Sequence, residues 1–296
     1  MPLGSAIAKL SKLPLKAFEP ATRKALFGDP AERIAVSPFT ANHLKTGIDS
    51  GRIAEVSIEG QAGSLHGHFH KSTAAAHTGK TVLFLSGSGS SAEDLSVDIA
   101  GKYCNEGVDV LSVNYRGFGK SQGVPSEDGL LRDAESMLDF LVKQKGIAPE
   151  NIIVHGYSLG GPVAAHVAKM SACSEQPLGG LVLDRPMVSA SKSAKAHGAP
   201  LPKLSGQILK ATQGSFSVNE NLQGMPVSMP IVLMTDGEGL GVQGEALRQR
   251  LVAQGFKVTG HRLECEHLDS MTAMEGAFDT IQQSCIDVAR RDPQAP

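Results

Sequence analysis

The sequence predicts a doubly wound α/β domain built on a mostly parallel, eight-stranded sheet with helices on both faces. Short apolar runs alternate with longer helical stretches across residues 51–290, and no internal repeat interrupts the alternation. Apolar runs that alternate with helices are typical of strands covered on both faces. With 296 residues, 41% of them hydrophobic, the chain is long enough to bury one large core.

The first two strands are expected at 53–58 and 64–70, and they should pair antiparallel because only a short turn joins them. Later strands are expected at 81–86, 108–114, 151–155, 180–184, 230–235 and 257–263. Helices are predicted at 92–106, 127–145, 161–170, 244–254 and 271–290. Their alternation with the later strands predicts parallel pairing in that part of the sheet.

Residues 1–50 form an extension before this domain and carry a basic bias. Five lysines and arginines precede residue 29, and Glu19 is the one acidic residue in that stretch. Apolar residues at roughly helical spacing predict a short helix or an arm that packs on the domain. The alternative is a segment that contacts an anionic membrane surface.

Residues 189–227 break the alternation of strands and helices. They are rich in Ser, Lys, Gly and Pro and follow the predicted strand at 180–184. A long insertion above the strand ends predicts a lid or part of a substrate wall, and the alternative is a surface excursion.

Charge and composition exclude several classes of partner. The formal net charge of −2 gives no electrostatic reason to expect nucleic acid. The sequence contains no apolar run of the roughly 18 residues needed to span a bilayer and no pattern of a secretory signal. Its four cysteines lie far apart, which favours a reducing compartment. We expect a cytoplasmic protein, or one exported without a signal peptide, with peripheral membrane association as the alternative.

The most informative stretch is Gly156-Tyr157-Ser158-Leu159-Gly160, which lies between a predicted strand and a predicted helix. The pattern G-x-S-x-G in that setting is the context of a nucleophile elbow. A sharp turn lifts the serine hydroxyl clear of the backbone, where a base can take its proton. Ser158 is therefore the predicted nucleophile.

The base and the acid should follow the serine in the order acid, then histidine. His267 comes after the last predicted strand and is the expected base. His261 lies inside that strand, where its side chain is committed to one face of the sheet, and it is the weaker candidate.

Three residues remain open for the orienting acid. Asp236 directly follows the strand at 230–235, and Glu238 lies two residues later with a longer side chain. Asp184, at the end of the strand at 180–184, is the third candidate. The sequence favours Asp236 and Glu238 equally and places Asp184, or the lack of an acid, behind them.

Donors for an oxyanion should come from two backbone amides. One is the amide of Leu159, directly after the nucleophile, and the other lies in the glycine-rich loop at 86–90. Ser88 is the expected second donor, because glycines beside it leave room for N–H groups to point inward.

A family resemblance rests on these motifs together with a second set. The matching residues are Asn114-Tyr115-Arg116-Gly117-Phe118-Gly119-Lys120-Ser121, Gly123, Pro125-Ser126-Glu127, Asp133, Gly156-Tyr157-Ser158-Leu159-Gly160-Gly161 and His267. The chain resembles serine hydrolases of the α/β-hydrolase superfamily over about residues 50–290. It is most similar to the branch that holds the abhydrolase-domain acyl-protein thioesterases and the yeast bud-emergence-type hydrolases. The resemblance implies hydrolysis of an ester or thioester without a cofactor, and it does not name the substrate. A small-molecule, acylated or lipid-like substrate is the expectation if residues 189–227 form a lid.

The sequence departs from this family at two places in the site. Ser86-Gly87 stands where the family usually has His-Gly, and Gly239 stands in the column of the acid. These departures keep open an inactive, hydrolase-fold binding protein as the alternative function.

Two further motifs suggest other functions. Residues 87–92 fit G-x-G-x-x-A after a strand, as in a dinucleotide-binding oxidoreductase, but Asn114-Tyr115-Arg116 stands where the ribose-binding acid is expected. His66, His68 and His70 alternate along one strand and could bind zinc. Because no fourth ligand lies nearby, we expect a solvated strand face and no metal site.

Overall fold

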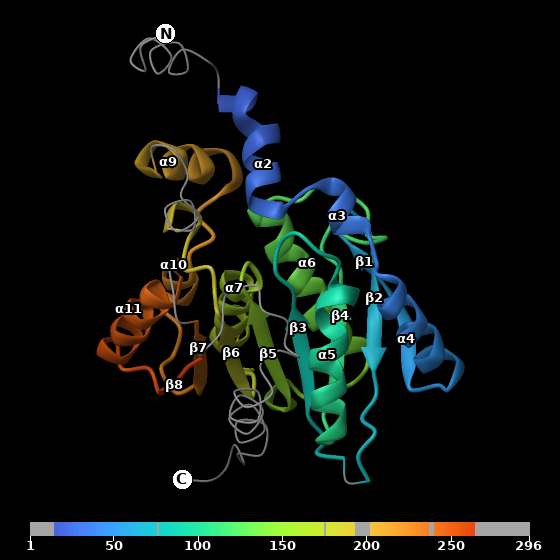
Figure 1. Cartoon of the computed structure of the whole chain (residues 1–296). Helices are drawn as coiled ribbons and strands as arrows, with labels where there is room; N and C mark the ends of the chain where they lie inside the picture. Colours follow the sequence, from blue (N-terminus) through green and yellow to red (C-terminus); the bar gives the residue numbers. More distant parts are fainter. Residues whose placement is uncertain (1–14, 76, 175, 193–201, 237–239, 264–296) are drawn as a thin grey trace.

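The computed structural model describes residues 15–75, 77–174, 176–192, 202–236 and 240–263, and its strands form a single mixed sheet (Figure 1). The strand order is β1-β2-β4-β3-β5-β6-β7-β8. β1 pairs antiparallel with β2 and β2 antiparallel with β4, whereas the other pairs are parallel. The predicted fold class is confirmed.

The strands are β1 (Ile53–Gly60), β2 (Gly63–His70), β3 (Thr81–Leu85), β4 (Asp109–Val113), β5 (Ile152–Tyr157), β6 (Gly180–Asp184), β7 (Ile231–Thr235) and β8 (Val258–Arg262). The helices that follow or cross the strands are α5 (Ala92–Asn105), α6 (Glu127–Asp139), α7 (Gly160–Cys173), α9 (Pro202–Gln213), α10 (Val218–Leu222) and α11 (Leu240–Ala253). α6 ends in a π-helical turn at Phe140–Gln144, so the predicted helix at 127–145 is two elements. The helix predicted at 271–290 lies outside the described residues.

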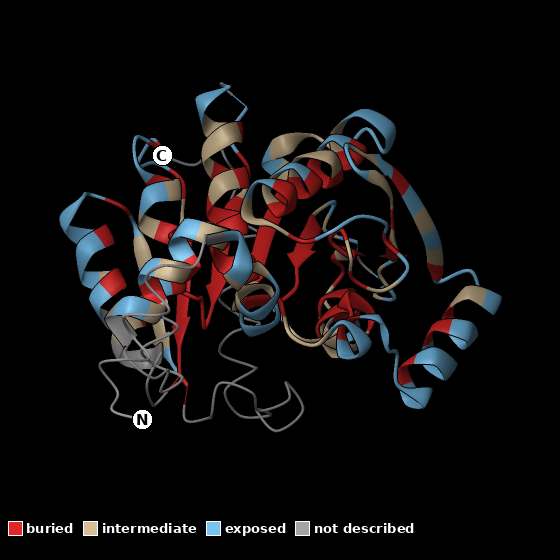
Figure 2. Ribbon diagram, turned by 90° about the horizontal axis from the view of Figure 1, so that it is seen from above, coloured by how far each residue is buried: buried red, intermediate tan, exposed pale blue. Residues whose placement is uncertain are grey.

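Side chains of the central strands are buried on both faces of the sheet, as β3 shows. Val82 and Phe84 belong to the cluster that packs under α5, and Leu83 and Leu85 belong to the cluster under α6 and α7. All four are fully buried. Figure 2 shows the same arrangement, with buried residues in the strands and on the inner sides of the helices. Successive strand residues point to opposite faces, so an unbroken apolar run needs helices on both sides.

In the described part of the segment before β1, a 3₁₀ turn (Leu15–Phe18) precedes three α-helices, α2 (Glu19–Phe27), α3 (Pro30–Ile34) and α4 (Pro38–Asp49). α2 lies beside α9, and Thr22 and Thr212 share a hydrogen bond of 2.9 Å between their hydroxyls. Phe27 is fully buried and packs edge-to-face on Phe216, with ring centroids 5.8 Å apart. From Leu15 onward the extension therefore packs on the hydrolase-like domain. In the described part of the chain, no helix is long and apolar enough to cross a membrane.

The strand face that carries the alternating histidines is not solvated, and that prediction is wrong. His68 and His70 are 8% and 4% exposed. β2 is covered because β1 pairs along its outer edge and α5 packs on its face. Among the residues that the structure describes, no cluster of three or more His, Cys, Asp or Glu side chains could hold a metal ion.

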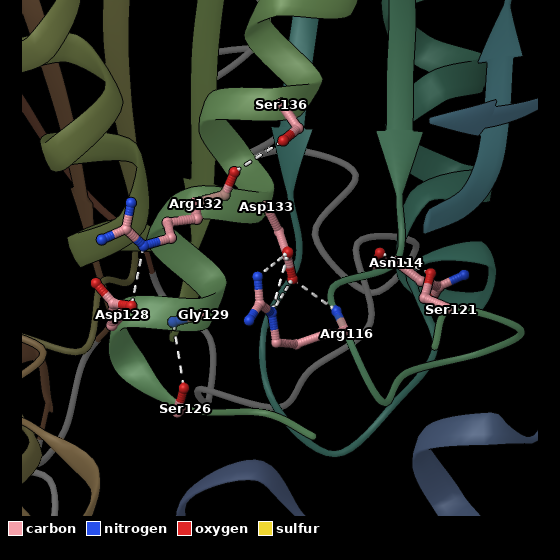
Figure 3. A network of polar contacts seen from close by, with 9 residues as sticks. All are labelled: Asn114, Arg116, Ser121, Ser126, Asp128, Gly129, Arg132, Asp133 and Ser136. Atoms are coloured by element: carbon pink, nitrogen blue, oxygen red, sulfur yellow. Dashed lines mark hydrogen bonds and ion pairs between the residues drawn. The ribbon is translucent and has the colours of Figure 1, made fainter. Parts of the chain in front are cut away.

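A buried ion pair fixes the loop after β4 to α6 (Figure 3). The guanidinium of Arg116 donates from Nη2 to Asp133 Oδ1 at 2.7 Å and from Nε to both carboxylate oxygens. The backbone N–H of Arg116 donates to Oδ2 of the same carboxylate at 2.7 Å. Asp133 is fully buried, so its charge depends on this partner.

Replacing Asp133 with Ala should lower the free energy of unfolding by about 3–5 kcal/mol, because it leaves the Arg116 guanidinium buried without its anion. Chemical denaturation would measure the loss. Asp128→Ala is the control, because Asp128 pairs with Arg132 one helical turn away and its side chain is 77% exposed. The control should cost no more than about 0.5 kcal/mol. Equal losses in the two variants would contradict the role given to the buried pair.

Candidate active site

Ser158 occupies a strained turn between β5 and α7. Its φ of +49° lies in the left-handed region, which is costly for a residue with a side chain, by about 1–3 kcal/mol. Three backbone hydrogen bonds hold the turn. The N–H of Ser158 donates to the carbonyl of Asp184 at 3.0 Å, and the carbonyl of Ser158 accepts from Gly161 and Met187 at 3.0 and 2.8 Å. The predicted strand–turn–helix geometry is therefore present.

The turn requires glycine on both sides because the backbone is crowded there. A Cβ on Gly156 would lie 2.3 Å from the carbonyl oxygen of Gly160. A Cβ on Gly160 would lie 2.0 Å from the carbonyl oxygen of Leu85, at the end of β3. Any side chain at either position would force β5, β3 and α7 apart.

The glycine-rich loop after β3 lies against the nucleophile. A Cβ on Gly87 would lie 3.4 Å from Cβ of Ser158 and 2.9 Å from the ring of Tyr157. Leu159 is buried at the start of α7, and Ser88 is exposed directly after Gly87. The structure thus brings both segments expected to supply oxyanion donors to the hydroxyl-bearing residue.

The amino-terminal extension supports this loop, a contact that the sequence did not reveal. The N–H of Gly89 donates to the carbonyl of Phe27 at 3.2 Å, where α2 ends. Gly28 follows with a φ of +82°, and a Cβ there would lie 2.5 Å from Cα of Gly89. The sequence signal is weak, because a lone glycine before Asp29 and Pro30 is an ordinary helix end.

Asp184 is engaged in a buried network of polar side chains next to the turn at Ser158. Its Oδ1 accepts from Arg185 Nε at 2.9 Å, and its Oδ2 lies 3.4 Å from His155 Nε2. Nδ1 of His155 in turn lies 3.0 Å from the hydroxyl of Tyr103. Burial alone would raise the pKa of Asp184, but the charge of Arg185 and the contact with His155 lower it to about 2. Both oxygens of this carboxylate thus already have partners within the core.

Asp236 has a different setting from Asp184. It follows β7 directly and is 4% exposed. β7 is two strands away from β5, which corresponds to about 10 Å, a span that an imidazole could bridge. His261 on β8 is three strands away, about 14 Å, which is too far for direct contact with the nucleophile. Glu238, Gly239 and His267 lie outside the described residues.

Comparison with known proteins places the fold in one class, the α/β-hydrolases. Residues 76–232 match the family model described as "Serine aminopeptidase, S33". The crystal structure of the alpha-beta hydrolase (ABH) from Vibrio vulnificus is 43% identical, with a TM-score of 0.82, and the match covers 92% of this chain and 94% of that one. The chain belongs to the serine aminopeptidase S33 family of α/β-hydrolases.

Two curated relatives extend the comparison. The multifunctional-autoprocessing repeats-in-toxin of Vibrio cholerae is 43% identical over 276 residues, which is 90% of this chain and 6% of that protein. The chain thus spans a small fraction of the toxin's length. The lysophosphatidylserine lipase ABHD12 of Danio rerio is 27% identical over 205 residues, covering 66% of this chain and 53% of that protein.

We expect Gly28→Ala to slow ester hydrolysis by roughly tenfold or more in kcat with a smaller change in KM, because donors to an oxyanion act on the transition state. The added methyl would push on the backbone of Gly89. Gly79→Ala is the matched control, since Gly79 has a φ of +74° and open space around its Cβ position. Similar kinetics in both variants would mean that the α2 contact does not shape the oxyanion loop.

Asp236→Asn and Asp184→Asn should separate catalysis from stability. We expect Asp236→Asn to reduce kcat by about 10²–10⁴, as the loss of an orienting acid does. Asp184→Asn should instead lower the melting temperature, because it weakens the pairing of the buried Arg185. Steady-state kinetics of both variants measure the change in kcat, and thermal melts measure the change in melting temperature. An active Asp236→Asn beside an inactive Glu238→Gln would assign the acid to Glu238.

Proposed function

We propose that this protein is a serine hydrolase that cleaves carboxylic ester or thioester bonds through an acyl-enzyme on Ser158. The observation that carries the proposal is the turn at Ser158, held at a φ of +49° with the loop of Gly87 against it. A strained turn of this kind keeps a hydroxyl exposed to a substrate and beside backbone donors at once.

In the proposed reaction, His267 takes the proton of the Ser158 hydroxyl as its oxygen attacks the carbonyl carbon of the substrate. Negative charge develops on the carbonyl oxygen, where the amides of Leu159 and Ser88 donate hydrogen bonds. The intermediate collapses, the bond to the alcohol or thiol breaks, and His267 returns its proton to the leaving group. A water molecule, deprotonated by the same imidazole, then releases the acid and restores Ser158.

The role of orienting acid goes to Asp236 in this proposal. Asp184 stands equally near a strand end, but His155 and Arg185 occupy its two oxygens. Asp236 is buried at the end of β7, where a carboxylate would hold an imidazole in one orientation. Glu238 is the alternative acid, as the sequence analysis also proposed.

The proposed substrate class is an acyl or lipid-like ester. Support comes from the similarity to a lysophosphatidylserine lipase and from the place of α9 and α10. These helices stand at the end of the sheet where α7 begins, and Asn221 of α10 donates to the carbonyl of Pro162 at 2.8 Å (Figure 1). A lid over Ser158 made from this segment would shield an acyl chain from water. Thioesters of acylated proteins, as in the thioesterase branch, are the second leaving-group class within the same chemistry.

Peripheral contact with an anionic membrane remains a weaker part of the proposal. Lys24 pairs with Asp29 at 2.6 Å, and Arg23 lies 3.9 Å from Glu19. Two of the five basic residues before residue 29 thus have acidic neighbours, which reduces the attraction that they would exert on an anionic surface.

A fluorophosphonate probe tests the proposal, because it labels only an activated serine. We expect labelling of the native protein and none of Ser158→Ala, together with a loss of p-nitrophenyl ester turnover of about 10⁴ or more. An acyl series from acetyl to palmitoyl, with aminoacyl p-nitroanilides beside it, reports substrate class. Absence of labelling would favour the inactive binding protein, and cleavage of the anilides alone would make the protein a peptidase.

A further inference from the structure

A cavity of about 290 Å³ lies between α4, the end of β2 and the last turns of α5. Its lining includes Arg52, Ile53, His70, Lys71, Ala100 and Cys104. The function proposed above uses none of them.

The cavity is remote from Ser158. His70 pairs with Val110 at the start of β4, and Val110 is level with Val82 and, through it, with Ile153. Ser158 lies five residues further along β5 and three strands across. These offsets separate the two positions by about 20 Å. Ligands of the cavity and of the elbow therefore do not compete for space.

His70 contributes its ring to the inner wall of the cavity. His70 is 4% exposed, and its Nε2 is buried without a hydrogen bond from any residue that the structure describes. Burial, with His68 and His43 nearby, lowers the pKa of His70 to about 3, so its ring is neutral at physiological pH. A neutral imidazole has one N–H donor and one acceptor nitrogen.

The rim of the cavity is cationic and its inner wall is apolar. Arg52 and Lys71 are exposed, and within the described chain neither forms an ion pair. None of the lining residues is acidic. Ile53, Ala100 and Cys104 contribute buried apolar surface, and burial raises the pKa of the Cys104 thiol to about 12, so the thiol stays protonated and unreactive.

We infer that this cavity binds a small organic anion. Its phosphate or carboxylate head would lie between Arg52 and Lys71, with the neutral ring of His70 forming part of the wall behind it. Its compact apolar body would pack on Ile53 and Ala100. Arg is suited to the planar recognition of either head group, and Lys supplies a second positive charge.

Calorimetric titration of the full chain with phenyl phosphate, benzoate and benzyl alcohol tests the inference. We expect at least one of the two anions to bind with a Kd of about 1 mM or tighter, and benzyl alcohol to show no binding. Which anion binds more tightly identifies the head group. Arg52→Gln and Lys71→Gln should each weaken binding by roughly tenfold.

Lys45→Gln is the matched control, because Lys45 lies on α4 outside the cavity and pairs with Asp49 at 2.6 Å. It removes the same charge and should leave the Kd unchanged. Arg52 and Lys71 are both exposed, so their variants should fold as the parent does. No binding of either anion by about 10 mM, equal weakening in Lys45→Gln, or no effect of Arg52→Gln and Lys71→Gln would each overturn the inference.

Discussion

Crowding of backbone on backbone at the end of β5 is the constraint on which the site depends. The carbonyl of Leu85 leaves no room for a side chain on Gly160, and the carbonyl of Gly160 leaves none on Gly156. Ser158 is held between these contacts, so its unfavourable φ cannot relax unless β3, β5 and α7 separate. β3 is buried throughout, and β5 and α7 are buried along most of their length, so the strain at Ser158 is held within close-packed structure.

The loops around this centre are held by polar groups that reach across long stretches of sequence. Asn114 Oδ1 accepts from the N–H of Ala92 at 2.8 Å, which anchors the start of α5 just after the loop of Gly87. Glu127 at the start of α6 accepts from the N–H groups of Ser215 and Phe216, at the base of the segment expected to form a lid. Burial raises the pKa of Glu127, while these two hydrogen bonds favour its charged form. The glycine-rich loop after β3 and the segment expected to form a lid are thus each tied to a helix that begins at the carboxyl ends of the parallel strands.

The sheet and the elbow could be predicted because contiguous residues encode them. Fewer than ten consecutive residues are enough to predict a buried strand such as β3, and the same holds for the turn at Ser158. The orienting acid could not be chosen, because Asp184 and Asp236 both end a buried strand and differ only in their neighbours. Asp184 differs from Asp236 in its contacts with His155 and Arg185. His155 lies 29 residues before Asp184, so no local sequence pattern predicts that contact. The contact between α2 and Gly89 was not predicted from the sequence either, because its partners are also far apart along the chain.

The prediction of a solvated face on β2 was wrong because of packing that involves the extension before the domain. Histidine at every second position of a strand near the edge of a sheet is the pattern of a solvated face. In the structure, α5 and the residues around α4 cover that face. Contact between α4 and β1 is close, since a Cβ on Gly47 would lie 2.3 Å from the side chain of Ile53. The same extension places Phe27 and Gly28 against the oxyanion loop at the opposite end of the sheet. Residues 15–50 therefore contact the sheet at both ends. Their packing supports the glycine-rich loop beside the proposed active site and also forms one wall of the proposed anion cavity.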